Sequence, residues 1–149
     1  MANKSLYHTD FAAWAFQQAA LLKDRKFDQI DWDDIIEEIE SMGKAEHRDL
    51  MSRMQVLISH LLKWQFQPER RSSSWTNTIR EQRHKIEDAC DDMPSLKGDL
   101  KSSEWLQKAW SRAVRDAVDE TNLPKNTFPQ QSIWTVEQIL DSDFFPPVE

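Results

Sequence analysis

A regular row of large apolar side chains constrains the fold of this chain more than any other feature of its sequence. The row runs at spacings of 4, 3, 4 and 3 residues, and its members are Leu50, Met54, Leu57, Leu61 and Trp64. Such spacing places side chains on one face of an α-helix. We therefore predict a helix over residues 44–66, about 30 Å long, with this face buried.

The residues after this helix predict a break and then another helix. Pro68 cannot continue the first helix, and the serines at 72–74 can accept hydrogen bonds from the free N–H groups that open the next one. The apolar spacing of 4, 3, 4 and 3 then repeats over Trp75, Ile79, Gln82, Ile86 and Ala89. We predict a helix over 75–92, in which the Gln82 amide is buried and needs hydrogen-bond partners.

The N-terminal third predicts two further helices, over residues 11–23 and 32–43. Each follows an aspartate that can cap it, Asp10 and Asp31. The second helix has an apolar stripe formed by Ile35, Ile39 and Met42. Gly43 then offers a stop or a kink before the long helix begins.

The C-terminal third predicts a helix over 103–121 and a short one over 136–140, where Thr135 and Gln138 form a capping-box pattern. We expect Phe144 and Phe145 in the tail to pack against the bundle. The chain has only two glycines and no alternating strand pattern. We therefore predict an all-α, single-domain bundle of about five main helices over residues 1–149, with a short C-terminal helix and an irregular tail.

The net charge and the cysteine content limit the classes of function that this chain can have. The formal net charge is −7, which disfavours binding of nucleic acid or an anionic membrane by the whole surface. The single cysteine, Cys90, permits no internal disulfide. No stretch approaches the roughly 20 apolar residues of a membrane span, and the N-terminus lacks a signal-peptide pattern. We expect a cytoplasmic protein without a membrane partner.

Several ordered motifs carry a family resemblance that covers nearly the whole chain. They are Tyr7-His-Thr-Asp-Phe-Ala-Ala-Trp14, Glu37-Glu-Ile-Glu-Ser-Met-Gly43, His60-Leu-Leu-Lys-Trp-Gln-Phe-Gln-Pro68, Ser74-Trp-Thr-Asn-Thr-Ile-Arg-Glu-Gln-Arg83, Pro94-Ser-Leu96, Phe128-Pro129, and Gln138-Ile-Leu-Asp141 followed by Phe144. With these motifs the chain resembles the bacterial domain-of-unknown-function 29 family. The resemblance implies a single-domain helical protein and no particular activity. One departure is Ser132-Ile-Trp134, where the family usually shows a Cys-Pro-Tyr-like segment.

The stretch from His60 to Arg83 is where we place a ligand or partner site. Between residues 63 and 85, six lysines and arginines stand against two acids. Arg80, Arg83 and His84 follow one another at i, i+3 and i+4, and guanidinium groups can hold phosphate or carboxylate. The ligand-binding residues that we predict are Glu38, His60, Trp64, Trp75, Arg80, Gln82 and Arg83.

Simpler interpretations compete with this site. Residues 27–49 carry nine acids and two bases, so ion pairs between that segment and the basic one would account for both charge runs without a ligand. The tryptophans fit a core, and His60 fits a histidine satisfied by neighbouring backbone. The acidic helix also fits a solvated face that complements the helix dipole.

Three functional hypotheses follow. The first is a small cytoplasmic binding or regulatory module that takes a protein partner or a small anionic ligand near His60, Trp64, Trp75 and Arg80. The second is a phosphate-ligand or nucleic-acid binder that uses the segment 63–85. The third is a metal-assisted enzyme in which Glu38 and His60 pair. Because no nucleophile or phosphate-loop motif occurs, we assign no catalytic residue, metal or cofactor.

Overall fold

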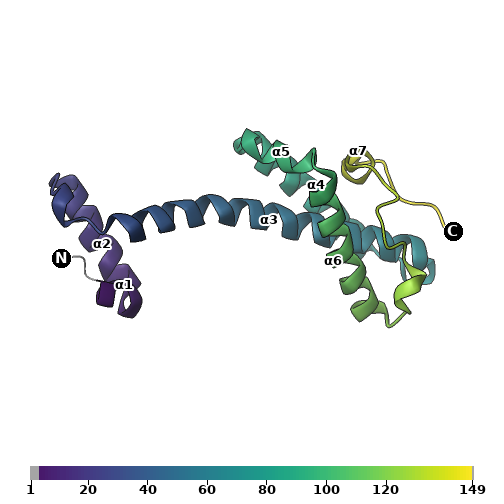
Figure 1. Cartoon of the computed structure of the whole chain (residues 1–149). Coiled ribbons are helices and arrows are strands. Elements are labelled where there is room, and N and C mark those ends of the chain that lie inside the picture. Colours follow the sequence, from purple (N-terminus) through teal and green to yellow (C-terminus); the bar gives the residue numbers. More distant parts are fainter. Residues whose placement is uncertain (1–3, 149) are drawn as a thin grey trace. The chain divides into compact units, whose positions relative to one another are not determined.

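The computed structural model describes residues 4–148 of the chain, and every regular element in this part is a helix, as the sequence predicts. The chain divides into two compact units, of which the first ends at Ala45 and the second begins at Glu46. We call them the N-terminal unit and the C-terminal unit. Figure 1 shows the order of the helices along the chain. The all-α prediction is therefore confirmed.

The N-terminal unit contains α1 (Lys4–Thr9), α2 (Phe11–Lys23), a 3₁₀ turn at Phe27–Gln29 and the beginning of α3 (Trp32–Phe66). The predicted cap of α2 is confirmed, since the Asp10 side chain accepts from the Ala13 N–H at 3.0 Å. Helix α1 was not predicted, because six residues are too few for a periodic pattern to identify.

Buried polar groups join α2 to the start of α3. The Trp14 indole donates to Asp31 Oδ2 at 3.3 Å, and the Asp31 backbone N–H donates to Gln18 Oε1 at 2.8 Å. All three residues are buried. Asp31 is therefore held by tertiary contacts from α2, which a pattern of caps along the sequence does not reveal.

Helix α3 is one continuous helix of 35 residues, where the sequence predicted two helices separated at Gly43. An isolated glycine costs a helix only about 1 kcal/mol relative to alanine. A Cβ added at Gly43 would meet nothing within 4 Å, so no close contact requires glycine there. The residues on both sides favour a helix, and the small local cost does not interrupt it.

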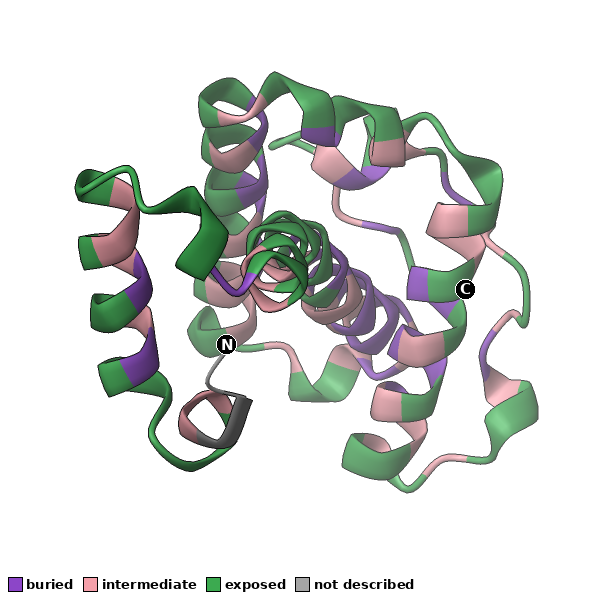
Figure 2. Ribbon diagram, turned by 60° about the vertical axis from the view of Figure 1, so that its left-hand side comes forward, coloured by how far each residue is buried: buried purple, intermediate pink, exposed green. Residues whose placement is uncertain are grey.

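The C-terminal unit packs the second half of α3 with α4 (Ser73–Asp92), α6 (Ser103–Thr121) and α7 (Val136–Leu140); a 3₁₀ turn at Pro94–Leu96 leads into the short α5 (Lys97–Leu100). Four members of the predicted apolar row, Leu50, Met54, Leu57 and Leu61, are buried. Figure 2 shows buried positions along this part of the fold. Full burial of such a side chain contributes about 1.5–3 kcal/mol, so this face of α3 is the centre of the unit.

The chain after α6 follows an irregular path through a further 3₁₀ turn (Lys125–Thr127), and aromatic rings hold it to the unit. The Trp110 indole donates to the Pro129 carbonyl at 2.7 Å, and the Trp110 and Trp134 rings are 5.1 Å apart. Phe144 and Phe145 pack against the core, as expected. The segment that departs from the family pattern thus places Trp134 in the core.

The burial and the hydrogen bonding of Gln82 differ from the prediction. Its side chain is only half-buried, and its Oε1 atom is shielded from solvent without a hydrogen-bond partner. The expectation that Gln82 finds buried partners is therefore wrong for this oxygen. An unsatisfied buried acceptor costs about 1–3 kcal/mol.

We expect Gln82→Leu to leave the free energy of unfolding unchanged or to raise it by about 1 kcal/mol, as measured by urea denaturation. The matched control is Gln55→Leu, because Gln55 Nε2 donates to Asp116 Oδ2 at 2.6 Å. That substitution leaves the Asp116 carboxylate without this donor, so it should lower stability by about 1–3 kcal/mol. A loss of this size in Gln82→Leu would contradict the interpretation.

Candidate functional site

Glu38 and His60 belong to different units, and each has a partner within its own unit. Glu38 accepts a hydrogen bond from the Tyr7 hydroxyl. That bond, together with neighbouring carboxylates, raises the pKa of Tyr7 to about 12. Within residues 4–148, no group of three His, Cys, Asp or Glu side chains could hold a metal ion.

His60 is half-buried on α3, and its Nδ1 lies 2.8 Å from the Val56 carbonyl oxygen one turn earlier. Because a carbonyl only accepts, this contact assigns the proton of the neutral ring to Nδ1. Burial is the main cause that lowers the pKa of His60, and the nearby Lys63 lowers it further. The His60 ring therefore has a backbone hydrogen-bond partner, and its surroundings favour the neutral form of the ring.

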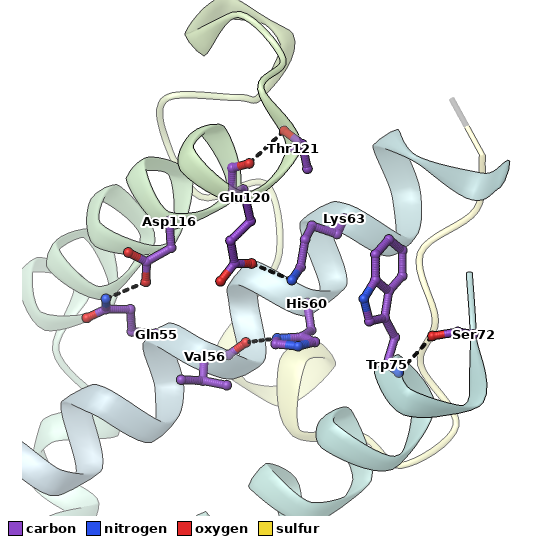
Figure 3. Close-up of polar contacts among 10 residues, drawn as sticks. Gln55, Val56, His60, Lys63, Ser72, Trp75, Asp116, Glu120 and Thr121 are labelled. Carbon is purple, nitrogen blue, oxygen red and sulfur yellow. Dashed lines mark hydrogen bonds and ion pairs between the residues drawn. The ribbon is translucent and has the colours of Figure 1, made fainter. Parts of the chain in front are cut away.

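Lys63 joins three helices of the C-terminal unit, as Figure 3 shows. Its side chain is buried and forms an ion pair with Glu120 of α6. The same nitrogen lies 5.3 Å from the centre of the Trp75 ring on α4. Trp75 therefore serves as a cation–π partner of Lys63 inside the unit.

Other cations of the basic segment are also engaged within the unit. Arg71 Nε donates to the Trp64 carbonyl at 2.8 Å, and its guanidinium lies 4.6 Å from the centre of the Trp64 ring. Lys85 pairs with Glu81 at 2.8 Å. The carboxylate partners of Lys63 and Lys85 are thus Glu120 and Glu81, rather than residues of the segment 27–49.

Arg83 of α4 holds the end of α7 and the tail. Its Nε donates to the Ile139 carbonyl at 2.8 Å, its Nη2 to the Phe144 carbonyl at 2.7 Å, and its Nη1 more weakly to the Ser142 carbonyl at 3.5 Å. The last carbonyls of a helix have no partner inside the helix. Arg83 therefore supplies one donor to the C-terminal end of α7 and two donors to the tail that follows it.

The predicted cluster of Arg80, Arg83 and His84 lines a single pocket of about 280 Å³, together with Glu87, Leu140, Ser142 and Phe145. The Phe145 ring lies 5.4 Å from the Arg83 guanidinium and 5.0 Å from the Trp64 ring. Trp64 thus packs against Phe145, a lining residue of the pocket. The sequence did not indicate the tail residues, because only tertiary packing brings them beside α4.

Gln82 lies apart from this pocket. It lines a shallow depression with Asp49, Ser52, Arg53 and Val56. Of the seven predicted site residues, Arg80 and Arg83 therefore line the pocket. Trp64 does not line it but contacts Phe145, which does. His60 and Trp75 lie with Lys63 and Glu120, and Glu38 belongs to the N-terminal unit.

The pocket contains more positive than negative charge. Arg83 is 5% exposed, and in the described part of the chain no carboxylate lies within 4.0 Å of it or of Arg80. Burial lowers the pKa of Arg83, and the charge of Asp141 opposes that effect only in part. A buried cation without a counter-charge is costly, so an anion in the pocket would be stabilised.

These features define an all-helical protein with a cationic pocket at the junction of α4, α7 and the tail. Within residues 4–148, no helix is long and apolar enough to cross a membrane. The chain belongs to the family described as domain of unknown function DUF29, whose model matches residues 6–145. The family resemblance of the sequence motifs is thereby confirmed. No curated protein and no solved structure matches the chain.

Arg83→Met keeps an unbranched apolar stem but removes the donors to the three carbonyls. Hydrogen bonds from a charged group contribute about 1.5–3 kcal/mol each and are not additive, so we expect the free energy of unfolding to fall by about 2–4 kcal/mol. Arg80→Met, at an exposed position one turn earlier, is the control and should change stability by less than about 0.5 kcal/mol. Equal effects in denaturant melts would contradict this role of Arg83.

His60 should make stability depend on pH. Its pKa in the folded state lies below the ordinary value of 6.5, so the unfolded chain binds more protons between these two values. The contribution of His60 is therefore complete above pH 6.5 and is lost as pH falls toward the folded-state pKa. We expect His60→Gln to flatten the decrease in unfolding free energy between about pH 7 and about pH 5. His84→Gln, at an exposed position, is the control, and an unchanged slope in His60→Gln would refute the expectation.

Proposed function

We propose that the protein is a binding module for a small anionic ligand whose charged group is phosphate or carboxylate and whose remainder is apolar. The observation that carries this proposal is Arg83, a buried guanidinium without a carboxylate partner that lines the same pocket as Arg80 and His84. An anion at this place would supply the counter-charge that the buried cation lacks.

The donors needed to hold such a group are present. Arg83 has five N–H donors, of which three contact backbone carbonyls. The nearest polar partner of Arg80 is Asn77 Oδ1, at a distance of 3.5 Å, which is a weak contact. Arg80 is therefore available to turn toward a ligand. Guanidinium groups suit planar carboxylates and phosphates because they can donate two parallel hydrogen bonds.

The remaining lining residues favour a ligand that also has an apolar part. Leu140 and Phe145 contribute apolar surface to the pocket, and Glu87 contributes a single negative charge. An inorganic anion would leave the apolar surface uncovered, whereas an aromatic or aliphatic group attached to the anion would cover it. The carboxylate of Glu87 also favours a ligand that presents its charge on the side of the arginines.

The alternatives receive less support. A nucleic-acid binder needs several free cations along one surface, but Lys63, Arg71 and Lys85 are engaged within the C-terminal unit. The metal-assisted enzyme receives less support, because Glu38 and His60 each have a partner within their own unit. The buried free thiol of Cys90 suits a reducing compartment, and we propose that the binding module acts in the cytoplasm.

Titration calorimetry with phenyl phosphate, benzoate and inorganic phosphate as probes at low salt tests the proposal. We expect saturable binding of phenyl phosphate, weaker binding of inorganic phosphate, and a loss of affinity of about tenfold in Arg80→Ala, which corresponds to about 1.4 kcal/mol. The control is Arg70→Ala, because Arg70 is exposed and lies outside the lining of the pocket. Absence of saturable binding for every probe, or equal affinities in both variants, would refute the proposal.

A further inference from the structure

A second pocket adjoins the cationic pocket along α4. Its volume is about 320 Å³, and it shares three lining residues with the cationic pocket, namely Arg83, Glu87 and Leu140. Its other lining residues are Ile86, Cys90, Asp91, Lys97 and Leu100. Glu87 is exposed and Leu140 is half-buried, so the border between the pockets lies at the surface and an elongated ligand can cross it. The two pockets are therefore the two ends of one groove along α4.

Three buried side chains of α4 form the floor of this groove. They are Arg83, Ile86 and Cys90, which follow one another at spacings of 3 and 4 residues. Such spacing places them on one face of the helix over about 10 Å of its axis. Along this length the floor changes from a guanidinium group to an aliphatic side chain and then to a thiol. The positive charge of the floor is therefore confined to one end.

A row of exposed charged and polar side chains on α4 borders the floor. Arg80, His84, Glu87 and Asp91 follow at spacings of 4, 3 and 4 residues, and all four line the groove. The basic side chains come first and the carboxylates last. At the second pocket Lys97 offsets only one of the two carboxylates. An anionic group is therefore favoured beside Arg80 and disfavoured at the other end.

Leucines from two other helices add apolar surface beyond the arginines. Leu140 of α7 lines both pockets, and Leu100 of α5 lines the second one. Both are half-buried, so part of each side chain remains available for contact with a ligand. A ligand that occupies only the cationic pocket would leave Leu100, Ile86 and Cys90 uncovered. Covering such surface with an apolar group stabilises a complex.

We infer that the groove binds an anion carried on an unbranched aliphatic chain. Its charged group lies at Arg80 and Arg83, and its chain extends past Leu140 to Cys90 and Leu100. Such a ligand is one class of the anions in the proposed function, on which this inference rests. The cationic pocket alone, at about 280 Å³, is smaller than a usual ligand site of about 300–1,000 Å³, whereas the two pockets together lie within that range. A flexible chain follows the border between them better than a rigid ring system does.

Titration calorimetry on the full chain with butanoate, hexanoate, octanoate and decanoate, below the concentrations at which they form micelles, tests the inference. Phenyl phosphate is the reference probe for the cationic pocket. We expect the affinity to rise by about twofold to fourfold for each methylene added between butanoate and octanoate, because each methylene buries apolar surface. Octylammonium has the same chain with the opposite charge, and it should bind at least about tenfold more weakly than octanoate.

Cys90→Met separates the second pocket from the cationic one, because the longer side chain fills the space beside Cys90. We expect the affinity for octanoate to fall by about tenfold and the affinity for phenyl phosphate to stay unchanged. The matched control is Val118→Met, since Val118 is a half-buried residue of α6 that lines a different pocket of the same unit. Denaturant melts should show that both variants remain folded.

Alkylation of Cys90 by iodoacetamide gives a second measurement that needs no variant. Cys90 is the single cysteine of the chain, so mass spectrometry reports its labelling directly. Octanoate at about 90% saturation should slow the labelling about tenfold, because the reagent then reaches the thiol only in the free protein. Phenyl phosphate at the same saturation should slow it much less, since its ring ends short of Cys90.

The outcomes separate this inference from the proposed function. Saturable binding of phenyl phosphate, with carboxylate affinities that do not depend on chain length, would overturn the inference and leave the proposed function standing. Absence of binding for every probe would overturn both. Equal affinities of octanoate and octylammonium, equal losses of octanoate affinity in Cys90→Met and Val118→Met, or labelling that octanoate does not slow would each overturn the inference alone.

Discussion

The structure depends on the burial of one face of α3 in the C-terminal unit. Leu57, Ile58 and Leu61 are fully buried there, and the helices α4 and α6 are joined to this half of α3 through Lys63 and its partners. The first half of the same helix is different, because Ile39 and Met42 are more than half exposed. A single continuous helix thus combines a core element in the C-terminal unit with exposed apolar side chains in the N-terminal unit.

Polar contacts inside the C-terminal unit engage several cations of its basic segment. Buried charges need partners, and the unit supplies them in two ways. Lys63 has a carboxylate within ion-pair distance, whereas Arg83 has backbone carbonyls and the Phe145 ring but no carboxylate at that distance. This difference directs attention to the pocket beside Arg83, since carbonyl oxygens carry only partial charges and do not neutralise the guanidinium.

The local features of the fold were predictable from particular residues. Asp10 caps α2, Ser72 accepts from Trp75 N–H at the start of α4, and Thr135 and Gln138 form the capping box of α7. Each signal depends on contacts within a few residues along the chain, which the sequence contains directly. The cluster of Arg80, Arg83 and His84 was predictable for the same reason, because spacing along a helix fixes which side chains are neighbours.

The sequence by itself determined most of the helices after α1, most of their ends and the face of α3 that forms the core, because these depend on local hydrogen bonds and on spacing at 3.6 residues per turn. Tertiary structure alone decided that Glu38 contacts Tyr7 and that the tail places Phe145 beside Arg83. It also decided that the stripe of Ile39 and Met42 remains exposed. An amphipathic pattern identifies the apolar face of a helix. Which segment of the chain covers that face, if any does, depends on how distant segments pack.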